Sequence, residues 1–176
     1  MQSPILLIDI DGVISLFGFD PASPPAGKFL LVEGIPHFLS TDIGSLIERL
    51  QADFELVWCS GWEEKADEYL PPALGLPAGL PHLSFEAAVS DNTAARHWKL
   101  SAIDAYAGPD RPLAWIDDAF DESCREWAAM RAAPTELLAT EPAVGLTPHQ
   151  TAHLMRWARS LKGAVAPGPG AEALES

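Results

Sequence analysis

Four carboxylates stand where two apolar segments of the chain end. Asp9 and Asp11 close the first segment, and Asp117 and Asp118 close another much later in the sequence. Like charges held close together raise one another's pKa, so such a cluster needs a compensating cation. Ligands that are all oxygen favour a hard divalent ion. The sequence therefore predicts a Mg²⁺ site to which these four residues contribute.

A hydroxyl and an amine complete a set of side chains suited to phosphate chemistry. A carboxylate nucleophile can split the hydrolysis of a phosphate ester into two displacements, while a second carboxylate protonates the leaving oxygen and later activates water. Ser60, at the end of another apolar run, and Lys99, at the start of a helical pattern, can hold the non-bridging phosphate oxygens. These residue types favour hydrolysis of phosphomonoesters.

The elements that must position these side chains are short apolar runs alternating with helical patterns. The strongest strand predictions are 4–10, 54–58 and 113–116, with weaker ones at 82–85 and 136–139. Helical patterns cover 41–51, 63–70, 99–107, 121–133 and 147–161. Pro71 and Pro72 are expected to stop the second helix, and a capping box from Thr147 to Gln150 to begin the last.

Strands alternating with helices predict a doubly wound, Rossmann-like α/β fold with a parallel sheet in three α/β/α layers. In such a sheet ligands bind beyond the carboxyl ends of the strands, where the polar residues fall. We expect one domain over residues 1–162, with a flap or hairpin at 13–39 and no large cap. Residues 163–176 lack a core pattern and are expected to be disordered.

The bulk composition narrows the classes of function. The chain has 176 residues, 48% of them hydrophobic, and a net charge of −14. This acidity disfavours extended binding to DNA or RNA, whereas a bound cation would still allow a small phosphorylated substrate. No apolar run is long enough for a membrane span and the start lacks a signal peptide, so a cytoplasmic location is expected. Cys59 and Cys124 are expected to be reduced and buried.

The order of the polar residues resembles the haloacid dehalogenase superfamily of phosphatases. Its first motif is matched by the segment from Asp9 to Gly12, and its fourth by Asp117 with Asp118. The resemblance implies that Asp9 is the phosphorylated nucleophile and a metal ligand. It also implies that Asp11 is the general acid/base and ligates Mg²⁺ through its backbone carbonyl.

The second and third motifs of the superfamily are matched by Ser60 and Lys99. By the same resemblance these two residues bind phosphate, and Gly61 leaves room for it near the backbone. Asp117 completes the metal shell, with Asp118 or Asp121 assisting. Asp121 is interpreted first as the cap of the following helix.

Three segments are similar to a narrower, capless branch that includes the phosphatase-like domain of some bacterial RNA-repair proteins. They are 56–62, 97–99 and 115–118. The acidity of the chain argues against a polynucleotide substrate and leaves a phosphorylated small molecule, a nucleotide or a nucleic-acid end. Either Trp62 or Trp98, which lie beside proposed site residues, could stack on a base or sugar. The leaving group and the oligomeric state stay open.

Several alternatives accompany this interpretation. A receiver-like module also uses an acidic cluster, a hydroxyl and a lysine, but its phosphorylated aspartate ends a middle strand, which here ends at Ser60. A non-catalytic binding module and transfer of phosphate to another acceptor are the others. His149 and His153 have the spacing of a metal pair, although a solvated or partly buried pair is the preferred interpretation.

Overall fold

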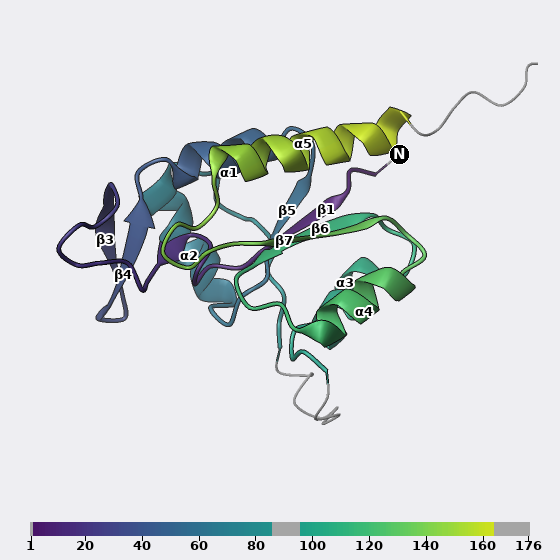
Figure 1. The fold of residues 1–176 in the computed structure, drawn as a ribbon, viewed down its shortest axis with the longest axis horizontal. Helices are drawn as coiled ribbons and strands as arrows, with labels where there is room; N and C mark the ends of the chain where they lie inside the picture. Colours follow the sequence, from purple (N-terminus) through teal and green to yellow (C-terminus); the bar gives the residue numbers. More distant parts are fainter. Residues whose placement is uncertain (1, 86–95, 164–176) are drawn as a thin grey trace, which may run out of the picture.

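A four-stranded parallel sheet forms the centre of the computed structural model, which describes residues 2–85 and 96–163 (Figure 1). Its order is β5-β1-β6-β7. The strands are β1 (Ile5–Ile8), β5 (Glu55–Trp58), β6 (Leu113–Asp117) and β7 (Thr135–Ala139). The three strongest strand predictions and the weaker one at 136–139 are confirmed.

The other weak strand prediction, 82–85, is wrong as a strand. Only His82 pairs with the sheet, by a single bridge to Trp58 at the open edge of β5. Two hydrogen bonds hold it there, from the Trp58 N–H to the Pro81 carbonyl at 2.8 Å and from the Leu83 N–H to the Trp58 carbonyl at 2.9 Å. Pro81 has no N–H with which to extend the ladder, so the pairing stays short.

Helices cover both faces of the sheet (Figure 1). They are α1 (Ile43–Leu50), α2 (Glu64–Leu74), α3 (Leu100–Ala107), α4 (Glu122–Met130) and α5 (Pro148–Gly163). Leu6 and Ile8 of β1 pack in a core with residues of α1, α2 and α5. Ile5 and Leu7 point to the opposite face, into a core with residues of α3 and α4. The alternation of side chains along β1 thus produces the predicted three-layer, doubly wound architecture.

The predicted end of α2 is wrong. The helix continues through Pro71 and Pro72 to Leu74 and ends at Gly75, whose φ of 72° is left-handed. Proline fixes φ near the helical value, so the backbone continues through both residues, although each lacks the N–H that would bond to the carbonyl four residues earlier. The carbonyl of Pro71 accepts hydrogen bonds from the N–H groups of Gly75 and Leu76 and closes the helix.

The start of α5 follows its sequence signal. Thr147 Oγ1 accepts a hydrogen bond from the Gln150 N–H at 3.3 Å, and Gln150 Oε1 accepts one from the Thr147 N–H at 3.0 Å. This is the predicted capping box. The helix reaches Gly163, the first residue of the predicted tail, while 164–176 lie outside the described residues.

A small antiparallel sheet follows β1. It consists of β2 (Ser15–Leu16), β3 (Gly27–Val32) and β4 (Ile35–Ser40), in the order β2-β4-β3. The turn between β3 and β4 places Glu33 and Gly34 at φ values of 50° and 86°, the geometry of a tight hairpin. The described parts of the chain contain no larger cap. We call residues 13–40 the flap.

Among the residues that the structure describes, no helix is long and apolar enough to cross a membrane.

Candidate active site

The carboxyl ends of β1, β5 and β6 lie level with one another. Ile8 is in register with Trp58 on one side and with Ile116 on the other. Beyond this row the Asp9 N–H bonds to the Ile116 carbonyl at 3.0 Å, and the Cys59 N–H bonds to the Ile8 carbonyl at 2.8 Å. The side chains that follow the strands therefore meet at one edge of the sheet, as the sequence predicts.

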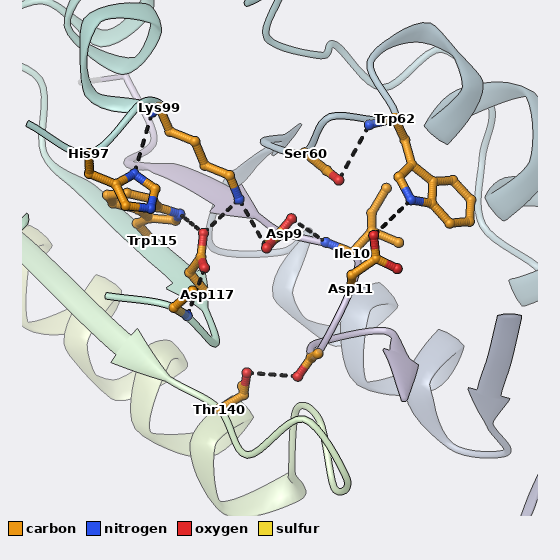
Figure 2. A network of polar contacts seen from close by, with 12 residues as sticks. Asp9, Ile10, Asp11, Ser60, Trp62, His97, Lys99, Trp115, Asp117 and Thr140 are labelled. Carbon is orange, nitrogen blue, oxygen red and sulfur yellow. Dashed lines mark hydrogen bonds and ion pairs between the residues drawn. The ribbon is translucent and has the colours of Figure 1, made fainter. Parts of the chain in front are cut away.

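A buried lysine joins two of these carboxylates (Figure 2). Lys99 Nζ lies 2.9 Å from Asp9 Oδ2 and 2.7 Å from Asp117 Oδ2. The exposed fractions of Asp9, Lys99 and Asp117 are 7%, 3% and 1%. Lys99 immediately precedes α3, so the start of this helix sets the place of its ammonium group. We call these three residues the buried triad.

Burial and charge work against each other in the buried triad. Burial raises the pKa of Asp9 to about 6, since the Lys99 ammonium lowers it by less and the Asp117 carboxylate raises it further. Burial alone would lower the pKa of Lys99, but the neighbouring Asp9 and Asp117 carboxylates leave it above its ordinary value. Lys99 is therefore charged at neutral pH, and it is the group that keeps Asp9 largely ionised.

The Asp117 carboxylate also accepts hydrogen bonds from residues of β6 and of the segment that follows it. Its Oδ2 accepts a hydrogen bond from Trp115 Nε1 at 3.1 Å, and its Oδ1 accepts one from the Ala119 N–H at 3.0 Å. Trp115 is two residues back on β6 and so faces the same way. These contacts fix the carboxylate before any ligand arrives.

Asp118 brings a third carboxylate to the same place. One oxygen from each of Asp9, Asp117 and Asp118 lies within 4.8 Å of the others. Burial, followed by the charge of Asp117, raises the pKa of Asp118. Gly12 makes room for it, because a Cβ there would lie 2.5 Å from Asp118 Oδ2, and its φ of +76° also favours glycine.

The three carboxylates fit a divalent cation. Two ligands that are each ~2.1 Å from one Mg²⁺ lie at most ~4.2 Å apart, so small rotations of the side chains would bring the oxygens into range. The donors are all oxygen and the cluster carries excess negative charge, which suits a hard ion. Within residues 2–85 and 96–163 no other group of histidine, cysteine and acidic side chains has this geometry.

Asp11 has different neighbours, although it is only two residues from Asp9. Its Oδ2 accepts a hydrogen bond from Trp62 Nε1 at 3.1 Å, and its Oδ1 lies 3.5 Å from His37 Nδ1. The strand alternation that would align Asp11 with Asp9 ends at Ile8. The chain then turns, and the Ile10 carbonyl accepts the N–H groups of residues 13–15. The carboxylate of Asp11 lies outside the three-carboxylate cluster.

Ser60 and Gly61 follow β5 at the same edge. The Ser60 side chain is buried, and its Oγ accepts a long hydrogen bond of 3.4 Å from the Trp62 N–H. Gly61 is exposed, and a Cβ there would meet only Trp98, at 3.9 Å. The protein itself therefore leaves space for a side chain at this position.

Several neighbouring residues have structural roles instead. Asp121 accepts a hydrogen bond from the Cys124 N–H at 3.1 Å and caps α4, as preferred from the sequence. Cys59 is buried and free, and burial raises the pKa of its thiol well above the usual range, which disfavours the reactive thiolate. His153 Nε2 lies 2.6 Å from Glu136 Oε1, and among the described residues neither His149 nor His153 belongs to a cluster of three potential metal ligands.

The sequence did not identify the partners that surround the carboxylates. Trp115 could have been inferred from its position two residues before Asp117 on the same strand face. Trp62 was considered only as a surface for stacking, but its indole N–H is directed at Asp11. His37 had no sequence signal, because only the fold of the flap brings it to the site.

Comparisons with known proteins do not show a family for this chain, so its function has to be argued from the geometry of the site. No family model matches the chain, and no curated protein matches it. One similar solved structure is from Vibrio cholerae and carries the provisional name 3-deoxy-D-manno-octulosonate 8-phosphate phosphatase. It has 17% sequence identity and a TM-score of 0.42, over 90% of this chain and 86% of that one.

Proposed function

We propose that this chain is a Mg²⁺-dependent phosphomonoester hydrolase that forms a phosphorylated intermediate on Asp9. The observation that carries the proposal is the buried triad, with Ser60 at the same sheet edge. A buried carboxylate kept ionised by one lysine has no evident role in folding, since buried ion pairs seldom add stability. It does have the properties of a nucleophile whose negatively charged substrate needs a cation beside it.

In the first displacement an oxygen of Asp9 forms a bond to phosphorus, and the bond from phosphorus to the ester oxygen breaks. Asp11 gives its proton to that leaving oxygen. Lys99 and Ser60 bind the non-bridging phosphate oxygens, on which charge is held in the transition state. These roles for Asp11, Ser60, Gly61 and Lys99 follow the motif pattern and are supported by their meeting at one edge.

In the second displacement Asp11, now a carboxylate, takes a proton from water as the water oxygen attacks phosphorus. The bond between phosphorus and Asp9 breaks, which releases inorganic phosphate and returns Asp9 to its ionised form. Because the same residue gives a proton and later removes one, each turnover leaves the protein unchanged.

Asp9, Asp117 and Asp118 would hold the Mg²⁺, with the backbone carbonyl of Asp11 added by the family pattern. When bound, the ion neutralises the charge of the phosphate and of the carboxylates together. The acidic surface disfavours extended nucleic acid, which leaves a phosphorylated small molecule, or a nucleotide or nucleic-acid end, as the substrate.

The test is phosphate release from a panel of phosphomonoesters, with Mg²⁺ or with a chelator. Wild type is compared with Asp9→Asn and with Asp20→Asn, a control at an exposed residue of the flap. We expect turnover in wild type and in the control only with Mg²⁺, and loss of about 10⁴-fold or more in Asp9→Asn.

Trapping with acid should recover phosphate bound to wild-type protein and none on Asp9→Asn. Phosphate that stays bound for many minutes without release would instead indicate a slow phosphorylation switch. An absence of both turnover and phosphorylation, on every ester, would refute the proposal.

A further inference from the structure

The carboxylate of Asp11 is held in place although it is half exposed. Its side chain is 52% exposed, yet both oxygens face side chains that are distant in the sequence. Trp62, which follows β5, donates to Oδ2 at 3.1 Å, and His37, on β4 of the flap, is 3.5 Å from Oδ1. An aspartate this exposed would otherwise rotate among several rotamers.

Trp62 is itself fixed from several directions (Figure 2). Its backbone N–H bonds to Ser60 Oγ, and its ring packs against the core between the sheet and α1. The indole and the His37 ring meet edge to face, with centroids 4.5 Å apart and planes at 68°. The loop that carries Ser60 and the flap therefore converge on Asp11 through one aromatic contact.

His37 is anchored by the flap. Its Nδ1 lies 3.0 Å from Ser15 Oγ, and Ser15 is paired with β4 in the small sheet. The distance of 3.5 Å to Asp11 is too long for a strong hydrogen bond. Oδ1 is thus the less strongly bound oxygen, and it is the one from which a proton can pass to a substrate.

We propose that Trp62, braced by His37, is a positioning residue that directs Asp11 for proton transfer in the reaction proposed above. The indole N–H fixes Oδ2 and so leaves Oδ1 directed for exchange with the leaving oxygen or with water. The inference rests on the proposed function, because it assigns Asp11 the acid/base role. It adds a residue, two positions after Ser60, whose hydrogen bonds go to Asp11 and Ser60 and not to Asp9, Asp117 or Asp118.

This role predicts an effect that depends on the leaving group. An alkyl phosphate cannot release its alkoxide without a proton, whereas 2,4-dinitrophenyl phosphate releases a stable phenolate without one. Misdirection of Asp11 should therefore slow the first displacement for the alkyl ester only. The second displacement should be slowed for both esters, because water must give up its proton whichever substrate supplied the phosphate.

The experiment compares Trp62→Phe with wild type on glycerol 1-phosphate and on 2,4-dinitrophenyl phosphate, with Mg²⁺. Phenylalanine keeps a ring against His37 but removes the N–H. Trp127→Phe is the matched control, since Trp127 Nε1 donates to Asp104 Oδ1 at 2.8 Å on α3, outside the site. Folding of each variant is checked by its thermal transition.

We expect Trp62→Phe to lower kcat on glycerol 1-phosphate by about tenfold or more, with little change in KM. On dinitrophenyl phosphate the first turnover, observed as a rapid burst of phenolate, should stay within about twofold of wild type. The steady rate that follows the burst should fall. The Trp127→Phe control should lower the rates on the two esters equally, or neither of them.

An equal loss of first-turnover rate on both esters in Trp62→Phe would overturn the inference, since the indole would then have only a structural role. No loss on either ester would overturn it as well. If wild type itself releases no phosphate from any ester, the proposed function fails first, and the inference fails with it. Activity in wild type therefore distinguishes a failure of this inference alone from a failure of the proposed function.

Discussion

Asp9 and Asp11 belong to one short motif, yet the protein surrounds them in opposite ways. Asp9 is 7% exposed and faces the charged ammonium of Lys99. The side chain of Asp11 is 52% exposed, and its hydrogen bond comes from the uncharged indole N–H of Trp62. Two identical carboxyl groups thus acquire different electrostatic settings over a distance of two residues.

In the proposed mechanism this difference suits the two carboxyl groups to two chemical roles. A nucleophile must be ionised and shielded from water, which a buried ion pair provides. An acid/base must exchange protons with ligands that come and go, which requires exposure and a fixed direction. The backbone turn after Ile10 separates the two settings, because it sends one side chain into the sheet edge and the other toward the flap.

Removal of the Lys99 ammonium should have the largest effect on stability, and it tests the buried environment of Asp9. In Lys99→Met, Asp9 and Asp117 stay buried without their counter-charge, which should cost about 3–5 kcal/mol of unfolding free energy. Denaturant unfolding in chelator measures the loss, and Mg²⁺ should restore part of it. Lys65→Met, which breaks the exposed pair with Glu33, is the control. A similar small change in both variants would show that the buried triad is not a charged unit.

The raised pKa of Asp9 predicts how stability depends on pH. A carboxyl group whose pKa is about 6 in the folded protein, against an ordinary value of 3.8, binds more protons folded than unfolded between these values. The stabilising contribution of protonated Asp9 to the unfolding free energy is therefore complete below pH 3.8. It is lost as the pH rises through about 6. The loss is at most about 3 kcal/mol.

Unfolding of wild type and Asp9→Asn in chelator, from pH 4 to 8, isolates this contribution as the difference between the two curves. The difference should shrink in Mg²⁺, because a bound cation favours the ionised carboxylate. Parallel curves in chelator would contradict the assigned environment of Asp9.

The space beside Asp118 allows a finer test of the metal cluster. Gly12→Ala and Gly18→Ala impose similar backbone strain, since φ is +76° at Gly12 and +75° at Gly18. Only the first places a Cβ against Asp118, because nothing lies within 4 Å of the second. Gly18→Ala should cost about 1 kcal/mol and Gly12→Ala about 1–2 kcal/mol more. Calorimetry should show weaker Mg²⁺ binding in Gly12→Ala alone, and equal binding in the two variants would remove Asp118 from the site.

The smallest change in stability is expected from a substitution beside the half-exposed Asp11. Trp62→Phe loses a hydrogen bond to a half-exposed carboxylate, so the unfolding free energy should fall by no more than about 1 kcal/mol. A thermal or denaturant transition measures it beside the kinetics described above. A much larger loss would mean that Asp11 and Trp62 support the fold, and the contrast with the buried triad would disappear.

Much of the architecture was predictable because it depends on short-range patterns. The continuous apolar runs at β1, β5 and β6 identify strands buried on both faces, and the capping box identifies the start of α5. The failures also have local explanations. The two prolines of α2 adopt the helical φ and do not end the helix, and the segment at His82 pairs through a single residue.

The residue types of the site were likewise determined by the sequence. Parallel strands end at a common edge, so the polar residues at the strand ends, Asp9, Ser60 and Asp117, had to meet once the strands were recognised. Their partners depend on packing between distant segments. Lys99 reaches both carboxylates because α3 begins beside them, and Trp62 finds Asp11 across 51 positions.

Sequence patterns thus establish which chemical groups collect at the sheet edge, since strand periodicity and the ends of strands are properties of neighbouring residues. Burial, ionisation and direction depend instead on what the folded chain packs around each group. The same carboxyl group is a shielded anion at Asp9 and a hydrogen-bonded, half-exposed group at Asp11, because desolvation and hydrogen bonding arise only from the tertiary structure.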